Sequence, residues 1–259
     1  MSFTPAEMMT VAAARALGND DVCFVGIGLP SAACNLARLT HAPRIHLIYE
    51  SGTLGTRPDV LPLSIGDGEL CETALTTVSV PEIFRYWLQG GRITVGFLGG
   101  AQVDRYGNLN STVIGEYGKP KVRLPGSGGA TEIATSCGKI FMVMRQGPRS
   151  FVERIDFVTS LGHGRTGRER RELGIRTQGP VLLVTDLCVM RPEAGTNELL
   201  VTSLHPGITR EEVTQKTGWP VRFAPGVEET APPDATELEA LRDLQARTAR
   251  AHGSSGGSE

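Results

Sequence analysis

Residues 22–30 read VCFVGIGLP, an apolar run that ends in glycines directly before a helical pattern. Apolar runs that are bounded by glycine or proline and alternate with helical patterns are typical of a mainly parallel sheet covered by helices. The same unit recurs along the chain, with helices expected at 5–17, 30–39, 81–88 and 234–251 and strands at 22–26, 44–49, 93–98, 139–144, 157–159, 181–185 and 198–203. The sequence therefore predicts an α/β fold with a mainly parallel open sheet and helices on both faces.

Length and composition limit the classes of protein to which the chain can belong. The chain has 259 residues, 40% of them hydrophobic, and a formal net charge of −2. We expect one large domain over residues 1–251 and a disordered, Gly- and Ser-rich tail over 252–259. The balanced charge offers no positive field for a nucleic acid or an anionic membrane. Because no stretch approaches the roughly 18 continuous apolar residues of a membrane span, and no basic leader region opens the chain, we expect a cytoplasmic protein.

Cysteine and histidine usage gives no sign of a metal or of a thiol nucleophile. The five cysteines are scattered without a CxxC pair, and the five histidines show no HExxH or similar spacing. Buried free thiols are therefore expected, and no metal site.

The most informative segment is residues 44–55, RIHLIYESGTLG, in which a predicted buried strand runs directly into Glu50 and then Ser51, Gly52 and Gly55. Ligands of parallel α/β sheets bind at the carboxyl ends of the strands, so Glu50 would project into that crevice. The glycines would let another backbone or a ligand approach closely. The alternative is a glutamate that points into water above an ordinary turn, and this segment alone does not decide between the two.

Two further glycine-rich segments could bind charged groups. Gly26 and Gly28 stand at a predicted helix start, where free N–H groups and the helix dipole favour an anion. The third glycine of the dinucleotide fingerprint is absent, so no nicotinamide or flavin cofactor is implied. In PGSGGA, residues 125–130, successive glycines could turn two N–H groups toward one point, as in an oxyanion hole. Taken alone, each segment is better explained by a turn, a tight strand-to-helix turn at Gly26 and Gly28 and a flexible turn at 125–130.

Polar and basic residues gather in two predicted loop regions. Residues 104–129 are expected to form loops with one short hairpin, and Asp104, Asn108 and Asn110 suit polar contacts with a substrate or a partner chain. Residues 162–171, GHGRTGRERR, contain four arginines. Arginine forks suit phosphate groups, whereas charge runs are typical of a solvated face.

Taken together and in this order, GIGLP, ESGTLG, GGAQVDRYGN and GSGGA resemble the β-type subunit of class I coenzyme A transferases across nearly the whole chain. In that family a Glu-x-Gly-x-x-Gly motif holds the nucleophilic glutamate, and a later Gly-x-Gly-Gly-Ala/Phe motif supplies oxyanion donors. The resemblance implies that Glu50 is catalytic and that the donors are Gly128, Gly129 and Ala130. It further implies contacts with CoA or substrate for Gly26, Gly28, Ser51, Gly52, Gly99, Gly100, Ala101, Gln102 and Gly126.

The resemblance also implies a partner and a substrate class. Members of this kind pair an α with a β half, so we expect an α subunit in a heterodimer or heterotetramer; CoA is a substrate, and no cofactor is expected. The phrases LPLSIGDGEL and IFRYWLQGGRITVGFLGGAQVDRYGN look closest to the branch that uses succinyl-CoA and 3-oxoadipate, with glutaconate transferases more distant. The chain reads Tyr-Glu-Ser-Gly where shorter 3-oxoacid transferases read Ser-Glu-Asn-Gly, which places it on the glutaconate-like branch and leaves the acceptor acid open.

The chemistry that the resemblance implies is ping-pong transfer through a glutamyl-CoA thioester on Glu50. An ionised glutamate attacks the acyl-CoA to give a mixed anhydride and CoA thiolate, and the thiolate then attacks the glutamyl carbonyl. Two alternatives use the same fold. An acyl-CoA hydrolase would need Glu50 to activate water, and a non-enzymatic ligand sensor would not need it.

Overall fold

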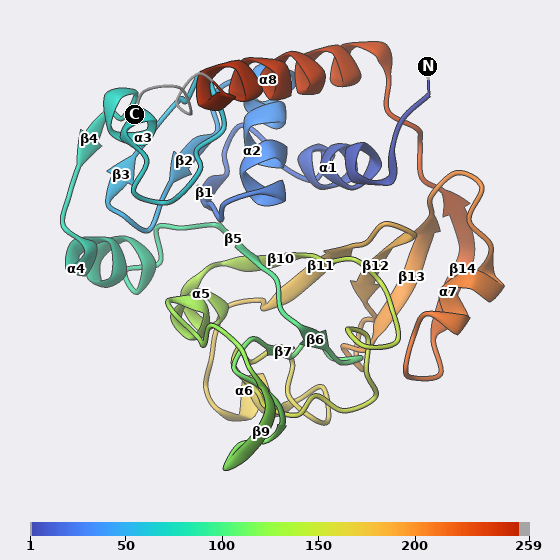
Figure 1. The fold of residues 1–259 in the computed structure, drawn as a ribbon. Coiled ribbons are helices and arrows are strands. Elements are labelled where there is room, and N and C mark those ends of the chain that lie inside the picture. The colour runs from blue at the N-terminus through green and yellow to red at the C-terminus, as the bar shows by residue number, and fades with distance from the viewer. Residues whose placement is uncertain (1, 254–259) are drawn as a thin grey trace.

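The computed structural model describes residues 2–253 (Figure 1). The strands of its main sheet are β1 (Val22–Phe24), β2 (His46–Ile48), β3 (Thr53–Leu54), β4 (Thr76–Thr77), β5 (Val95–Leu98), β10 (Lys139–Val143), β11 (Pro180–Val184), β12 (Cys188–Pro192), β13 (Leu199–Leu204) and β14 (Arg222–Glu229). Two hairpins lie outside it, β6 (Gln102–Val103) with β7 (Leu109–Asn110) and β8 (Val113–Glu116) with β9 (Lys119–Arg123). The helices are α1 (Pro5–Arg15), α2 (Leu29–Leu39), α3 (Gly68–Glu72), α4 (Val80–Glu82), the π-helical turn η1 (Ile83–Leu88), α5 (Ala130–Ser136), α6 (Glu169–Glu172), α7 (Arg210–Gln215) and α8 (Ala235–Gly253).

The main sheet has the order β14-β13-β12-β11-β10-β5-β1-β2-β3-β4. Its centre is parallel, because β11, β10, β5, β1 and β2 pair in one direction. Antiparallel pairs extend it on both sides, through β12 and β13 at one end and β3 and β4 at the other. The predicted mainly parallel open sheet is confirmed, and the antiparallel ends are an addition to it.

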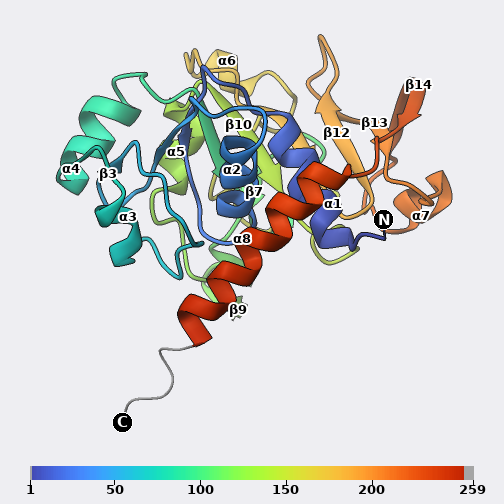
Figure 2. The ribbon, with the colours of Figure 1, turned by 90° about the horizontal axis from the view of Figure 1, so that it is seen from above.

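Helices cover both faces of the sheet, as predicted. Helices α1, α2 and α8 lie over one face, and α5 lies over the other (Figures 1 and 2). Side chains of a strand point alternately to the two faces, so neighbouring residues of β5 enter different cores. Phe97 belongs to the core cluster that contains Leu36 and Leu241 on the α2 and α8 side, whereas Leu98 belongs to the cluster that contains Ile133 and Ile83 on the α5 and η1 side.

Three local predictions need correction. The strand predicted at 157–159 is wrong. Ser160 makes only an isolated bridge with Leu109, and the hydroxyl of Thr159 bonds with Ser111 and Thr112. The helix predicted at 81–88 is present, but its last six residues form the π-helical turn η1. The region expected to hold one short hairpin contains β8–β9 and also the return strand of β6–β7.

The C-terminal helix is confirmed and is longer than predicted. Helix α8 reaches Gly253, so the predicted tail over 252–259 begins with two helical residues, and the rest of that tail lies outside the described residues. The ring of His252 bonds with the carbonyl of Leu61 at 3.0 Å, which holds this end of the helix. Within residues 2–253, no helix is long and apolar enough to cross a membrane.

An ion pair joins the first helix to the last. The Arg242 guanidinium donates from Nε to Glu7 Oε1 at 2.7 Å, while Glu7 also accepts from the Thr4 N–H at 2.7 Å. The bond from Arg242 holds the pKa of Glu7 at about 2, below its usual 4.5. A carboxyl whose pKa is lower in the folded state stabilises the fold above its ordinary pKa, and this contribution disappears as the pH falls through the folded value.

The variant Glu7→Gln is expected to lower the free energy of unfolding by about 1–2 kcal/mol at pH 7 and by roughly half as much near pH 3. Urea unfolding of both proteins at several pH values measures this difference. A difference that stays constant between pH 7 and pH 3 would contradict the ion-pair explanation.

Candidate active site

Glu50 stands at the carboxyl end of β2, one residue beyond a firmly anchored tyrosine. Tyr49 is fully buried on the α2 side, and its hydroxyl bonds with Ser31 Oγ at 2.7 Å. Because successive side chains of an extended chain alternate in direction, Glu50 faces the opposite side, toward α5 and η1. The core therefore sets the direction of Glu50.

A tight turn after Glu50 reverses the chain into β3. The Gly52 N–H donates to the Tyr49 carbonyl at 3.0 Å, and Gly52 has φ 109°. A Cβ on Gly52 would overlap the carbonyl oxygen of Val78, and one on Gly55 would lie 2.6 Å from the Leu75 side chain. These two glycines therefore make room for the neighbouring segment of the chain itself. A further role for Gly52 in binding CoA stays a prediction.

The carboxylate of Glu50 lies against Gly129, directly before α5. A Cβ on Gly129 would lie 3.0 Å from Glu50 Oε1 and 2.8 Å from Cζ of Phe84. The structure thus brings together the two motifs that the sequence singled out separately. Glu50 is half-buried, and its carboxylate has no hydrogen-bond or ion-pair partner within residues 2–253. An unpaired carboxylate in this setting can act as a nucleophile.

The backbone amides before α5 are not equivalent. The Ala130 N–H donates to the Ser127 carbonyl at 2.8 Å and is therefore used inside the turn. The amides of Gly128 and Gly129 have no acceptor in the described part of the chain. Of the three predicted oxyanion donors, these two remain the candidates.

The other predicted glycines share the sheet edge of Glu50. Strands β5, β1 and β2 are adjacent and parallel, so their carboxyl ends meet at one edge. Gly26 and Gly28 follow β1, while Gly99 and Gly100 follow β5. A Cβ on Gly28 would meet no atom within 4 Å, whereas one on Gly100 would lie 3.0 Å from the carbonyl oxygen of Asn110. Gly28 therefore borders open space and Gly100 borders the protein's own backbone.

Ala101 and Gln102 take part in internal packing. The Ala101 N–H donates to the Asn110 carbonyl at 2.8 Å. Gln102 donates from Nε2 to Asp156 at 3.1 Å, and its Oε1 accepts from Asn110 Nδ2 at 2.7 Å. These bonds account for the buried position of Gln102 without a substrate contact.

Gly126 and Ser51, which are also predicted to contact CoA or substrate, differ in whether their polar groups are already bonded within the protein. Gly126 is held by Ser111, whose carbonyl accepts the Gly126 N–H and whose hydroxyl donates to the Gly126 carbonyl, both at 2.9 Å. The hydroxyl of Ser51, next to Glu50, is buried and finds no partner within residues 2–253. Ser51 is thus the freer of the two for a contact with substrate.

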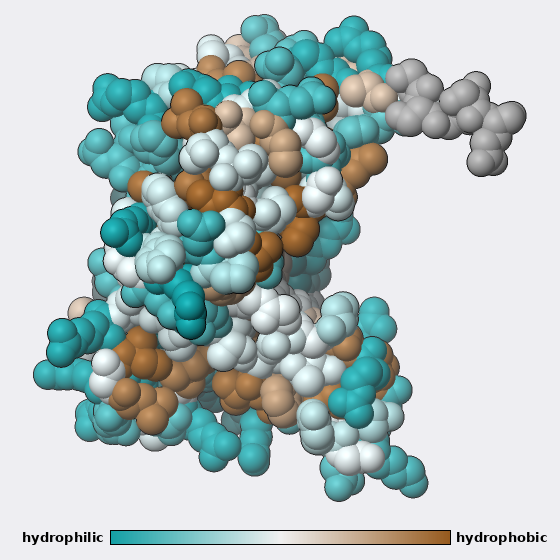
Figure 3. Space-filling model, turned by 90° about the vertical axis from the view of Figure 1, so that its left-hand side faces the viewer, coloured by the Kyte–Doolittle hydropathy of each residue, from teal (hydrophilic) through white to brown (hydrophobic). Residues whose placement is uncertain are grey.

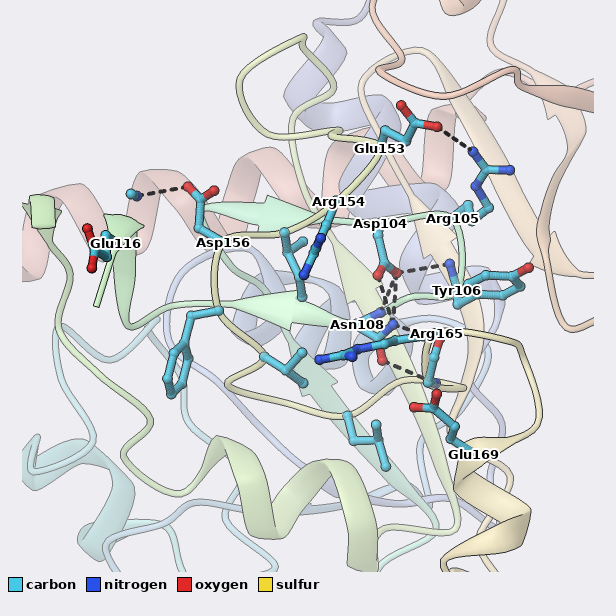
Figure 4. A pocket seen from close by; sticks show the side chains of 16 residues that line it. Asp104, Arg105, Tyr106, Asn108, Glu116, Glu153, Arg154, Asp156, Arg165 and Glu169 are labelled. Carbon is cyan, nitrogen blue, oxygen red and sulfur yellow. Dashed lines mark hydrogen bonds and ion pairs between the residues drawn. The ribbon is translucent and has the colours of Figure 1, made fainter. Parts of the chain in front are cut away.

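Asp104, Asn108 and Asn110, which the sequence suggested for contacts with a substrate or a partner chain, are buried and bonded inside the protein, Asn110 to Gln102 and Val113. Asn108 donates from Nδ2 to both carboxylate oxygens of Asp104 and to the Gly164 carbonyl. Burial raises the pKa of Asp104. These contacts hold loops together, and a contact with a substrate or a partner chain stays a prediction. Asp104 and Asn108 line an open hollow of about 1240 Å³, whereas Glu50 and Gly129 do not (Figure 4).

Arg170 departs from both interpretations of the arginine-rich run, whereas Arg165, Arg168 and Arg171 are exposed, as the solvated interpretation predicts. Arg170 is buried, 4% exposed, and donates to carbonyl oxygens that include those of Ala134, Gly162 and Thr177. Burial lowers its pKa to about 10. Arg170 is therefore neither solvated nor free for a phosphate, and its bond to Ala134 supports α5 behind the oxyanion glycines.

The cysteines are mostly buried thiols, as predicted. Cys71 is exposed, while Cys23, Cys34, Cys137 and Cys188 are buried. Burial raises the pKa of Cys137 and of Cys188 to about 12, which keeps both protonated at neutral pH.

Phe84 is the site residue that the sequence did not reveal. Its ring borders Gly129 beside the Glu50 carboxylate, from the turn η1. The segment reads only as an apolar helix, because a π-helical turn leaves no distinct pattern of residue types. No signal in the sequence could have found this contact.

Comparison with known proteins finds relatives over nearly the whole chain. A family model for coenzyme A transferase matches residues 6–216. The B-type subunit of 3-oxoadipate CoA-transferase from Pseudomonas knackmussii is 64% identical over 258 residues, which cover 100% of this chain and 99% of that protein. The B-type subunit of glutaconate CoA-transferase from Acidaminococcus fermentans is 38% identical, over 93% of this chain and 92% of that one. The crystal structure of glutaconate coenzyme A-transferase from Acidaminococcus fermentans aligns with a TM-score of 0.89 and 32% identity, over 96% of this chain and 97% of that one.

Proposed function

The chain belongs to the coenzyme A transferase family, and from this we propose that it is the glutamate-bearing subunit of an enzyme that transfers CoA from succinyl-CoA to 3-oxoadipate. One observation carries the proposal: the unpaired carboxylate of Glu50 lies against Gly129, whose N–H, like that of the preceding Gly128, has no acceptor in the described part of the chain. The acceptor is chosen because the 64% identical relative is a 3-oxoadipate transferase.

The geometry supports a covalent route. An oxygen of the Glu50 carboxylate attacks the thioester carbonyl of succinyl-CoA, and the N–H groups of Gly128 and Gly129 stabilise the oxyanion that forms. The C–S bond then breaks and leaves a mixed anhydride and CoA thiolate. The thiolate attacks the glutamyl carbonyl, succinate leaves, and the glutamyl-CoA thioester keeps the energy of the original bond. The incoming oxo acid reverses these steps and leaves as its CoA ester.

A partner subunit fits the surface next to this site. The relatives at 64% and 38% identity are both B-type subunits of their enzymes. Leu75, Val80 and Tyr86 are exposed by 76%, 46% and 60% on the segment that flanks Glu50 and Phe84. Apolar side chains lie exposed among hydrophilic ones on the face that carries β4 and α4 (Figure 3). We propose that the A-type partner covers this face and excludes water from Glu50.

Chemical trapping tests the proposal. The complex, co-expressed with its A-type partner, is incubated with succinyl-CoA and then with borohydride, which reduces a glutamyl thioester to an alcohol. We expect loss of activity and a modified peptide that contains Glu50. Full activity after this treatment would exclude the thioester and favour the hydrolase alternative. Rates with 3-oxoadipate and glutaconate as acceptors then test the choice of substrate.

A further inference from the structure

The geometry around Gly129 leads us to propose that Phe84 shields the glutamyl-CoA thioester from water and so favours transfer over hydrolysis. This inference rests on the proposed function, because it concerns the lifetime of the intermediate that Glu50 would form. It assigns a specific task to a residue outside both glycine motifs.

Phe84 and Glu50 border the same point. A Cβ on Gly129 would lie 2.8 Å from Cζ and 3.1 Å from Cε1 of Phe84, and 3.0 Å from Glu50 Oε1. The tip of the ring and Glu50 Oε1 therefore lie beside the same point above Gly129, next to the amides that would hold the oxyanion. In this proposal, the ring closes the approach of water to the glutamyl carbon from the Gly129 side.

The protein core holds the ring in this position without a ligand. The Phe84 carbonyl accepts the Gln89 N–H at 2.9 Å, a bond of the π-helical type. Ile83 and Leu88, fully buried, anchor the two ends of the turn. The buried ring of Phe24 meets that of Phe84 edge to face, with centroids 6.1 Å apart. The Phe84 ring is thus held in position before any substrate binds.

Hydrolysis is the side reaction that such a shield would suppress. The oxygen of water bonds to Cδ of Glu50, and the C–S bond breaks. CoA leaves as a thiol with one proton of the water, the second proton passes to solvent, and the Glu50 carboxylate re-forms. Because a phenyl ring offers no acceptor to orient or deprotonate water, it disfavours this step while it leaves the amides of Gly128 and Gly129 free.

The variant Phe84→Ala, in the co-expressed complex, tests the inference. The complex is loaded with succinyl-CoA and desalted to remove succinate and free CoA ester, and the remaining glutamyl-CoA is measured by mass spectrometry over time. We expect its lifetime to fall at least about tenfold, with a matching rise in the ratio of hydrolysis to transfer. The variant Phe84→Leu keeps apolar bulk and should stay within about threefold of wild type.

The outcomes separate the possible failures. If the thioester in Phe84→Ala decays as slowly as in wild type, the shielding role is overturned. The same holds if less thioester forms but its decay rate is unchanged, because that pattern indicates a purely structural residue. If Phe84→Ala does not fold, Phe84→Val decides by the same decay measurement, and an unchanged lifetime overturns the inference. Absence of any thioester on wild-type Glu50 would instead refute the proposed function.

Discussion

Replacement of Glu50 by glutamine is expected to abolish CoA transfer, with a loss of at least about 10³-fold in kcat. An amide has nearly the shape of a carboxylate, so the glutamine side chain fits beside Gly129, but it is a far weaker nucleophile and cannot form the anhydride. The assembled complex is assayed with succinyl-CoA and 3-oxoadipate. The glutamyl-CoA thioester should be undetectable by mass spectrometry.

A matched control separates chemistry from fold. Glu172 is exposed on α6 and lies outside the proposed site, so Glu172→Gln should transfer CoA at the wild-type rate. Circular dichroism and co-purification with the partner should be unchanged in both variants. Transfer by Glu50→Gln within tenfold of wild type would remove Glu50 as the nucleophile.

The centre of the fold could be predicted from sequence because its signals are local. The apolar run before Glu50 is a buried strand, and a strand end in a parallel sheet is where a ligand group is expected. Short two-residue strands such as β3 and β4 carry no periodic pattern, since their pairing is set by the turn at Gly52 and the close approach of Val78. These antiparallel ends could be seen only in the structure.

The site itself was predictable only in part, for a similar reason. Glu50 and Gly129 are each marked by neighbouring glycines, so both were found without knowledge that they touch. The roles of Arg170 and Asn108 depend on the carbonyl groups of Ala134 and Gly164, which are distant in the sequence, and a sequence does not show which polar groups will pair. Phe84 is an ordinary apolar residue whose importance comes from a change in helical pitch. The role of each of these residues therefore depends on which groups it contacts, and the residue type alone does not show those contacts.

Substitution of Gly129 by alanine should have the second-largest effect, with kcat reduced by about 10²-fold or more. Gly129 has φ −81° and ψ −2°, outside the left-handed region that favours glycine, so the effect can be assigned to the added methyl group. That methyl group would lie 3.0 Å from Glu50 Oε1 and 2.8 Å from Phe84 Cζ, so the carboxylate or the ring must move. Because the change displaces the nucleophile, kcat should fall far more than KM rises.

Two comparison variants show whether the Glu50 carboxylate or the Phe84 ring is displaced by the new methyl group. Gly68 is exposed, and a Cβ on it would meet no atom within 4 Å, so Gly68→Ala should leave kcat unchanged. In the double variant Gly129→Ala/Phe84→Leu, the shorter side chain removes the ring atoms that oppose the new methyl group, and part of the lost rate should return. Without any recovery, the contact with Glu50 alone would account for the loss. A Gly129→Ala enzyme with kcat within about threefold of wild type would mean that Glu50 does not react while lying against Gly129.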